Sequence, residues 1–400
     1  MRKSSKNGGS ESVLHVTFIV TKNCQLACKY CYLVGKNSHE RMEWPIAKKM
    51  IDFLFQNDEY FKEDKIVLNF IGGEPLLEVE LMDKICDYFK TEAFAREHKW
   101  FNGYRINIST NGLNYNSEKV QSFIQKNYRH LSIGITIDGD KEKHDMNRIY
   151  KSDGRGSYDS VVSNIPLWLK QFPLAGTKVT ISSEDLPFVK NSIIHLFTLG
   201  IHEVNVNCVF ENVWKEGDDI IFEEQLTMLA DEIIDNLWYK DYFCSFFSKK
   251  IGRPLSHRDN SNWCGCGRMI AVDAHGYLYP CTRFSKFSLR EKPPRIIGTL
   301  ENGINKNFVR PFRTLNRIGQ SRQECIDCEV ASGCAWCQGE NYDAAETPTV
   351  YQRATAICKM HKARVRANNY YWNKLFRKLE LEGRREEYER NKPMCDGKIC

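Results

Sequence analysis

A closely spaced cysteine triplet constrains this chain more than any other feature of its sequence. Cys24, Cys28 and Cys31 follow directly after the apolar run 13–20. Thiolates at this spacing can hold three irons of a cubane cluster, and such clusters are normally held by four cysteines. The missing fourth ligand would leave one iron open to a substrate or a cofactor. Taken alone, the triplet is also compatible with a zinc knuckle or a buried cysteine cluster.

The composition limits where such a chain works. It has 400 residues, a formal net charge of +6 and 16 cysteines. The first ten residues are polar and no apolar run approaches membrane-spanning length, so we expect a cytoplasmic protein that engages no membrane. In a reducing compartment, cysteines serve metal or redox chemistry more often than disulfides. The modest charge favours a mixed solvated surface over nucleic-acid binding.

The remaining cysteines are unevenly distributed. Eight lie between Cys264 and Cys358, and five are scattered, namely Cys86, Cys208, Cys244, Cys395 and Cys400. The triplet and the group of eight would together supply one open cluster and two fully ligated ones. We expect the first three scattered cysteines to be buried apolar residues. The last two are expected in a terminal tail.

Residues 13 to about 210 alternate β-rich runs with amphipathic patterns. The predicted strands are rich in Val, Ile and Phe and lie at 13–20, 66–71, 104–109, 131–137, 177–182 and 202–209. Helical periodicity fills the intervals, at 45–55, 79–95, 117–127, 157–170 and 189–199. Six β/α units in a row indicate an α/β fold, a partial (β/α)6 barrel of TIM type. Its site should lie at the carboxyl ends of the strands.

A change of character near residue 262 predicts a second region. Residues 220–240 have a helical pattern, after which cysteines and glycines become frequent. Residues 269–281 read as a hairpin with an Asp/Gly turn, and 351–390 as a basic helix. We therefore divide the chain into a disordered tail (1–12), a barrel (13–215), a helical linker (216–261), a cysteine-rich domain (262–360) and a basic C-terminal helix and tail (361–400).

Polar motifs follow the second and third predicted strands. Gly72, Gly73 and Glu74 follow the second. Glycines allow close backbone approach to a ligand, and a carboxylate can accept a hydrogen bond from an amine. Ser109 and Asn111 follow the third strand. Each motif by itself is also an ordinary turn signal.

The run from Ser132 to Arg148 follows the fourth strand. The guanidinium of Arg148 suits a carboxylate, and we expect His144 and Asp145 to order this loop. The cysteine triplet, the aromatic Tyr30 before its last member, and the motifs after the next three strands resemble the radical S-adenosylmethionine (SAM) enzymes.

The resemblance implies that the triplet Cys24, Cys28 and Cys31 is catalytic and holds a [4Fe-4S] cluster that binds SAM. It implies SAM contacts by Tyr30, Gly72, Gly73, Glu74, Ser109, Asn111 and Arg148. Among these, the glutamate would meet the amine, the serine and asparagine the ribose, and the arginine the carboxylate. In this family SAM yields a 5′-deoxyadenosyl radical that removes hydrogen from an unactivated carbon.

The second cysteine group is similar to the SPASM domain of peptide-modifying radical SAM enzymes, which holds two auxiliary [4Fe-4S] clusters. The resemblance assigns two sets, the first made of Cys264 or Cys266 with Cys281 and Cys337, the second of Cys325, Cys328, Cys334 and Cys358. The opening Cys-x-Cys and the two residues before Cys337 depart from the usual spacing. If Cys264 or Cys266 is not a ligand, the first auxiliary cluster has an open iron for a substrate thiolate. Two zinc sites are the alternative.

The stretches 327–339 and 358–369 look most like maturases whose precursors carry Cys-x-x-x repeats, of the ranthipeptide or sactipeptide type. The resemblance therefore implies an enzyme with SAM and three [4Fe-4S] clusters that joins a precursor cysteine sulfur to a carbon of another residue. The partners expected are a ribosomally made, cysteine-rich precursor peptide and a one-electron reductant such as flavodoxin or ferredoxin. No nucleic acid or membrane partner is expected.

Other functions are compatible with parts of the sequence. One is carbon–carbon or ether crosslinking of a peptide. A second is formylglycine formation in a sulfatase, but the maturases that do this place an aspartate where Thr282 follows Cys281. A third is a non-catalytic iron–sulfur carrier or sensor, for which Glu74 and Arg148 would have no purpose.

Overall fold

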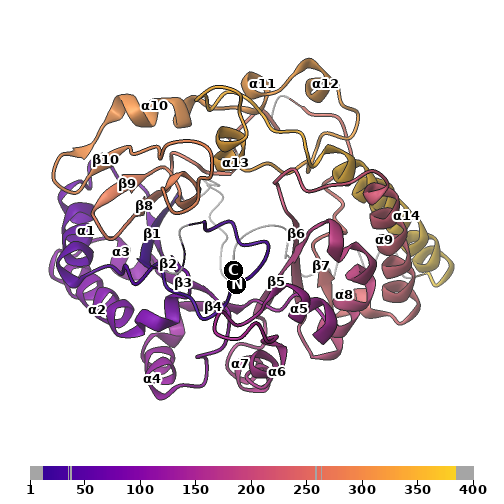
Figure 1. Cartoon of the computed structure of the whole chain (residues 1–400), viewed down its shortest axis with the longest axis horizontal. Coiled ribbons are helices and arrows are strands. Elements are labelled where there is room, and N and C mark those ends of the chain that lie inside the picture. The colour runs from indigo at the N-terminus through magenta and orange to yellow at the C-terminus, as the bar shows by residue number, and fades with distance from the viewer. Residues whose placement is uncertain (1–11, 35, 37, 257–258, 263, 384–400) are drawn as a thin grey trace, which may run out of the picture.

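The strands form the wall of a partial barrel, with the cysteine-rich segment along its open side (Figure 1). The computed structural model of the chain describes residues 12–383 apart from 35, 37, 257–258 and 263. The expectations for residues 1–11, Cys395 and Cys400 lie outside the described residues.

All six predicted barrel strands are present. They are β1 (Val13–Thr21), β2 (Lys65–Gly72), β3 (Tyr104–Thr110), β4 (Leu131–Ile135), β5 (Gly176–Ile181) and β6 (Glu203–Cys208). The first four pair in parallel and in sequence order, with Val16 opposite Leu68 and Leu68 opposite Ile106. β5 and β6 pair in parallel in a separate sheet. The predicted α/β barrel class is confirmed.

The two sheets meet at β4 and β5 through a side chain. The Thr177 hydroxyl on β5 donates to the Ile135 carbonyl at 2.7 Å and accepts from the Ile137 amide at 3.0 Å. The strand predicted over 131–137 ends at Ile135. The Thr136 amide still donates to the Thr110 carbonyl of β3, but the Ile137 amide is bonded by the Thr177 side chain instead of a neighbouring backbone.

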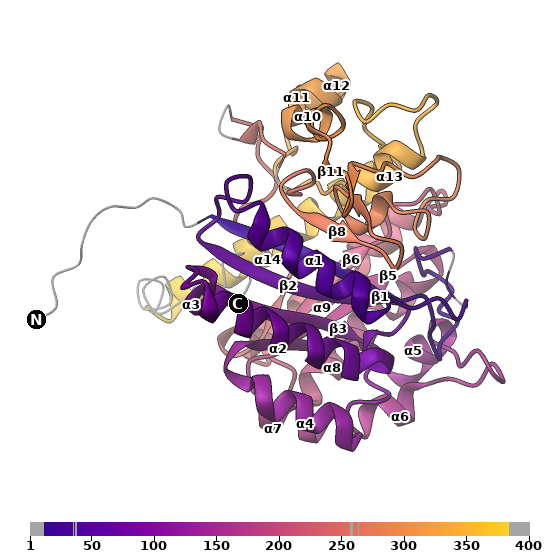
Figure 2. The same ribbon diagram turned by 90° about the vertical axis from the view of Figure 1, so that its left-hand side faces the viewer.

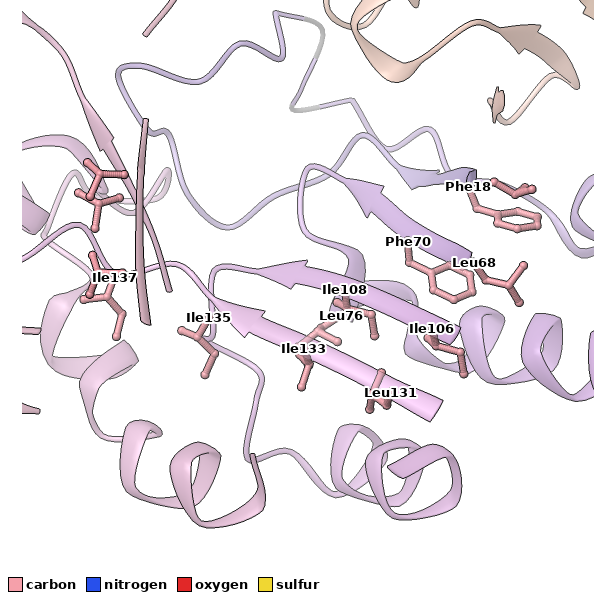
Figure 3. Packing of buried hydrophobic residues seen from close by; sticks show 14 of the residues in the cluster. Phe18, Leu68, Phe70, Leu76, Ile106, Ile108, Leu131, Ile133, Ile135 and Ile137 are labelled. Atoms are coloured by element: carbon pink, nitrogen blue, oxygen red, sulfur yellow. The ribbon is translucent and has the colours of Figure 1, made fainter. Parts of the chain in front are cut away.

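Apolar side chains fill the space between the strands and the outer helices (Figure 3). Ile106 and Ile108 are at most 1% exposed, whereas Arg105, Asn107 and Ser109 alternate with them and are less deeply buried. Full burial of one such apolar side chain stabilises the fold by about 1.5–3 kcal/mol. Since the barrel is incomplete, its inner face carries polar groups that reach solvent or each other.

The outer helices are α1 (Trp44–Gln56), α2 (Val79–Ala95), α3 (Trp100–Gly103), α4 (Glu118–Asn127), α5 (Lys141–Asn147), α6 (Tyr158–Val162), α7 (Ile165–Gln171) and α8 (Val189–Thr198). Pro45 begins α1 near its first position, as predicted. The single helix predicted over 157–170 is divided into α6 and α7, because Pro166, near the start of α7, has no amide to donate to the carbonyl of Val162 at the end of α6.

The interval expected as a helical linker contains more than a helix. Its helix is α9 (Asp218–Asp235), and the strand β7 (Phe243–Cys244) follows and pairs in parallel with β6. The interval 216–261 therefore belongs partly to the barrel wall. No helix within the described residues is long and apolar enough to cross a membrane.

The cysteine-rich segment continues the barrel sheet. The predicted hairpin is present as β8 (Ile270–Val272) and β9 (Tyr277–Tyr279), and β8 pairs in parallel with β1. Short elements follow, namely β10 (Gly298–Thr299), β11 (Gly303–Ile304), α10 (Lys306–Thr314), α11 (Arg317–Gln320), α12 (Gln323–Ile326) and α13 (Gln338–Asp343). The terminal helix α14 (Cys358–Leu381) packs against α9. It starts before residue 361, so Cys358 is its first residue.

Candidate active site and cluster sites

The loop after β1 carries the cysteine triplet, and the end of β2 lies directly beside it. The Gly73 amide donates to the Thr21 carbonyl at 3.0 Å, and the Glu74 amide donates to the Asn23 carbonyl at 2.9 Å. A Cβ atom on Gly73 would lie 2.2 Å from the Asn23 oxygen and 2.9 Å from the Cys24 Cβ. The two glycines are therefore required for the approach of these two chain segments.

Glu74 joins the ends of β2 and β3. Its Oε1 accepts from the Thr110 hydroxyl at 2.6 Å and the Leu76 amide at 3.0 Å, and its Oε2 accepts from the Asn111 amide at 2.7 Å. The side chain is 1% exposed, and burial raises its pKa despite these donors. The predicted contact of Glu74 with an amine remains a prediction, since these donors already use much of the carboxylate.

The two polar residues at the end of β3 have different surroundings. The side-chain nitrogen of Asn111, Nδ2, donates to Gln25 Oε1 at 3.1 Å and lies 4.0 Å from the Cys24 sulfur. The Ser109 hydroxyl accepts from Lys178 Nζ on β5 at 3.1 Å. Asn111 is thus next to the triplet, whereas Ser109 lines the barrel interior beside a lysine that sequence reasoning did not single out.

Arg148 and Tyr30 form one buried chain with Asp138. Arg148 Nη1 donates to the Tyr30 hydroxyl at 2.9 Å, and that hydroxyl donates to Asp138. Desolvation alone would raise the pKa of Asp138, but the charges of Lys143 and Arg148 lower it overall. Arg148 is 6% exposed, and its Nε has no hydrogen-bond partner among the described residues.

The Nε of Arg148 has no hydrogen-bond acceptor among the described residues, and this shows whether the site suits the carboxylate of SAM. A buried guanidinium nitrogen without an acceptor is costly, and a carboxylate is its usual partner. Arg148 also acts on the thiol of Cys28, whose pKa is raised by burial and lowered in part by this charge. The arginine therefore lies next to the triplet with a free donor, which fits the carboxylate of a ligand held there.

Burial raises the pKa of two of the triplet thiols, Cys24 and Cys28, so these two are protonated unless a cation is present. Burial and the charge of Glu74 raise the pKa of Cys24 to about 11. Metal ligands must be thiolates, and bound iron supplies the charge that stabilises them. Within the described part of the chain, no three His, Cys, Asp or Glu side chains converge on a single metal ion. Thiolates that share a single metal ion lie within about 4 Å of each other. A cubane cluster instead binds each thiolate to a different iron.

His144 and Asp145 order the loop after β4, as expected. The His144 Nε2 is 3.0 Å from the Ser157 hydroxyl, and Asp145 accepts from the Tyr158 amide at 2.8 Å. Burial lowers the pKa of His144 to about 3, so the ring is neutral. Figure 2 shows that the loop after β1 and the helix α5 gather at the same end of the barrel.

The first cysteine set of the second region is close together. A hydrogen bond with Cys266 lowers the pKa of Cys264 to about 7. Burial raises the pKa of Cys266, and the neighbouring Cys264 and Cys281 raise it further. Burial likewise raises the pKa of Cys337 to about 11, with Cys281 and Cys264 among the nearby charges. All four side chains therefore share one site, including both members of the Cys-x-Cys pair.

The second set is also assembled. The pKa of Cys325 is raised by burial and by Cys358 and Cys328, against the charge of Arg353. The pKa of Cys334 is raised by burial and by Cys358 in the same way. The thiols of each set thus influence one another in the fold, whereas the assignment of either set as cluster ligands stays a prediction.

Arg283 connects the triplet loop, the barrel and the first cysteine set, and sequence reasoning missed it. Its Nη2 donates to Glu211 at 3.1 Å and to Glu340 at 2.9 Å, and its guanidinium carbon lies 4.7 Å from the centre of the Tyr32 ring. Tyr32 follows Cys31 and is hydrogen-bonded with the Thr282 side chain. No motif marks this arginine, whose partners come from three distant segments.

Comparisons with known proteins agree with this geometry. Residues 11–162 match the family model described as a 4Fe-4S single cluster domain. The chain is 23% identical, over 79% of its length and 83% of the relative, to a cysteine-type anaerobic sulfatase-maturating enzyme of Clostridium novyi. It is 25% identical, over 69% of its length and 56% of the relative, to the antilisterial bacteriocin subtilosin biosynthesis protein AlbA of Bacillus subtilis.

The solved structures define the fold. Native anSMEcpe with bound AdoMet superposes with a TM-score of 0.65, covering 92% of this chain and 99% of that one at 17% identity. This chain has the same fold as that structure, a partial α/β barrel followed by a cysteine-rich segment. The loop with Cys24 lies at the carboxyl ends of the barrel strands, and the cysteine-rich segment, which we call the SPASM segment after the resemblance in its sequence, continues the sheet beside β1.

Proposed function

We propose that the chain is a radical SAM enzyme that modifies a ribosomally made precursor peptide by forming thioether links from cysteine sulfur to a carbon of another residue. The observation that carries the enzymatic part is the buried Arg148, whose unused Nε lies beside the triplet loop. An electron carrier has no need for a free carboxylate-binding group next to its cluster.

Each residue has a defined role in this proposal. Cys24, Cys28 and Cys31 hold a [4Fe-4S] cluster with one open iron, and Arg148 binds the SAM carboxylate. When bound, the cluster and SAM supply a 5′-deoxyadenosyl radical that abstracts a hydrogen from carbon. Tyr30 and Asp138 orient the arginine through their hydrogen-bond chain. The two further cysteine sets hold auxiliary clusters, and flavodoxin or ferredoxin supplies the electron.

The peptide substrate is supported by similarity. Both relatives have names that refer to maturation of a protein or biosynthesis of a bacteriocin. Tyr32 follows Cys31 of the triplet and is also affected by Cys281 of the first cysteine set, which supports a substrate sulfur held at that set being near the site of hydrogen abstraction. Thioether formation would remove one carbon-bound hydrogen as an atom, taken by the deoxyadenosyl radical, and the thiol hydrogen as a proton released to solvent, and an auxiliary cluster would accept the remaining electron.

The test is an assay of anaerobically reconstituted enzyme with SAM, dithionite and a cysteine-rich candidate precursor. We expect 5′-deoxyadenosine together with a peptide whose mass shows both hydrogens lost and whose modified cysteine resists alkylation. Absence of 5′-deoxyadenosine from fully loaded protein contradicts the radical SAM assignment. Deoxyadenosine with an alkylatable cysteine contradicts the thioether assignment alone.

Formylglycine formation is the second candidate, favoured by the similarity to the sulfatase-maturating enzyme. In this chain Thr282 follows Cys281, and its side chain is bonded to Tyr32. The neighbouring charged side chain is Arg283, which is committed to Glu211 and Glu340. A sulfatase peptide in the same assay separates the candidates. Formylglycine contains an aldehyde, which reacts with hydrazine reagents, whereas a thioether does not react with them.

A further inference from the structure

A buried tryptophan between two arginines lies next to the second cysteine set. The guanidinium carbon of Arg317 is 4.5 Å from the centre of the Trp336 ring, and that of Arg353 is 4.9 Å from it. Trp336 is 3% exposed, Arg317 5% and Arg353 7%. Such stacking holds the two cations in fixed positions.

Both arginines contact the second set directly. Arg353 Nη2 donates to the Cys334 sulfur at 2.9 Å, and Arg317 Nη2 donates to the Cys334 carbonyl at 3.0 Å. Arg353 Nη1 has a longer contact, 3.4 Å, with the Ser321 hydroxyl. The Nε of Arg317 is buried without a hydrogen-bond partner among the described residues. Their polar contacts are therefore with uncharged groups and one cysteine.

Among the residues that the structure describes, no carboxylate forms an ion pair with either cation. Within the described part of the chain, the carboxylate that most affects Arg317 is Asp259, and that group is paired with Arg253 at 2.9 Å. Glu324 acts on Cys325 but is exposed, so solvent screens it. A buried unpaired guanidinium costs several kcal/mol. A negative group must therefore compensate the pair, and the site of Cys325, Cys328, Cys334 and Cys358 is next to it.

The first cysteine set has a different electrostatic setting. Its nearest arginine, Arg283, is paired with Glu211 and Glu340. Arg290 is likewise paired with Glu340 and Asp343. Arg268 also acts on Cys264, but it is exposed, so solvent screens its charge. The buried positive charge at the first set is thus matched by carboxylates, whereas the buried charges at the second set are not.

We propose that Arg317 and Arg353 stabilise the reduced form of the cluster at the second set, so that it has the higher reduction potential of the two auxiliary clusters. The inference rests on the proposed second cluster. Adding an electron makes a thiolate-bound cluster more negative, and nearby uncompensated cations and N–H···S bonds favour that state. Trp336 holds both cations in place by stacking. It also lies between Cys334 of the second set and Cys337 of the first set in the sequence, so the chain connects the two sets through it.

The test is a redox titration of the reconstituted holoenzyme monitored by electron paramagnetic resonance. Replacing Cys325 and Cys328 by Ala identifies the signal of the second cluster. Arg353→Gln should shift that midpoint to lower potential and leave the other auxiliary midpoint in place, and Arg353→Lys should shift it less. Arg322→Gln removes the same charge from an exposed position between α11 and α12 and should shift neither.

The outcomes separate the inference from the proposed function. Iron loss in Arg353→Gln that Arg353→Lys restores also supports the charge requirement. An unchanged midpoint in both Arg353→Gln and Arg317→Gln, with iron retained, overturns the inference while leaving the second cluster. If Arg353→Gln loses iron and Arg353→Lys loses it equally, the inference is overturned as well. If the Cys325/Cys328 variant contains as much iron as the parent protein, the proposed second cluster itself is wrong.

Discussion

The barrel and the SPASM segment of this chain are stabilised in different ways. The first six barrel strands have five to nine residues, whereas the strands of the SPASM segment have two or three. In the barrel, Phe18 stacks on Phe70 with ring centres 5.6 Å apart, within a continuous apolar core. The SPASM segment joins the same core through residues such as Phe284 and Phe312, but it does so with little regular structure, and it buries charged side chains such as Arg317 and Glu340 beside its cysteines.

This difference indicates how far each region positions its site residues before a cofactor binds. The barrel core can position Glu74, Tyr30 and Arg148 before any cofactor is present, because their hydrogen bonds are made within the chain. A segment with so little regular structure depends on metal for its organisation. We therefore expect loss of iron to affect function in the barrel and structure in the SPASM segment.

The largest expected effect comes from the triplet. Replacing Cys24, Cys28 and Cys31 together by Ala should abolish 5′-deoxyadenosine formation and leave the melting temperature of the barrel nearly unchanged, because its core does not include the loop. Chromatographic detection of deoxyadenosine and thermal unfolding would test both. Cys86→Ala, which alters a fully buried cysteine away from the site, should keep the activity. Turnover by the triple variant would refute the site assignment.

A smaller and more selective effect is expected in the SPASM segment. Replacing Cys325 and Cys328 by Ala should reduce peptide crosslinking more than uncoupled SAM cleavage. Amide hydrogen exchange should rise in residues 317–358 and remain low in 104–135, since the apolar core protects the latter. Equal loss of cleavage and crosslinking, with the triplet cluster intact, would show that this division of roles is wrong.

The next effect concerns ligand binding in the barrel. Arg148→Gln should weaken SAM binding at least tenfold, because loss of a buried charged partner costs about 2 kcal/mol or more. Equilibrium dialysis against the reconstituted protein measures it. The matched control is Arg155→Gln, an exposed arginine that pairs with Asp153 at 2.8 Å on the following turn. An equal affinity for SAM in both variants would contradict the assignment of Arg148.

The smallest effect is a pH dependence of barrel stability. Burial lowers the pKa of His144 to about 3 from a usual value of 6.5, so the unfolded chain takes up this proton at higher pH than the folded one. The stability is therefore greatest above pH about 6.5 and decreases as pH falls towards about 3. His144→Gln should lessen the decrease in unfolding free energy between pH 7 and pH 5, measured by denaturant titration. The same slope in both proteins would be inconsistent with a buried neutral ring.

Sequence patterns predicted the barrel because the apolar patterns of its strands and helices are local and periodic. The strands β1 to β6 begin and end within two residues of their predicted bounds, with β4 ending before Ile137, whose amide donates to the Thr177 hydroxyl. Pro166 marks the break between α6 and α7 and could have corrected the single helix predicted there. The Gly72–Gly73 pair was recognised as a close approach, although the partner in the structure is the loop backbone.

The charged contacts around the cysteine sets could not be predicted in the same way. Arg283 contacts Tyr32, Glu211 and Glu340, which are separated from it by many residues and carry no common spacing. The arrangement of Arg317 and Arg353 about Trp336 likewise depends on how irregular loops fold back on each other. Such contacts follow from tertiary structure alone, so a single sequence contains no periodic signal for them.

Cys358 is both a member of the second set and the first residue of α14. That helix reaches across to the far side of the barrel wall, where Arg366 contacts Glu223 at 2.6 Å and Lys374 contacts Asp231 at 2.8 Å on α9. A cluster at the second set would therefore be covalently joined, through α14, to the packing of that helix against α9 on the opposite side of the wall.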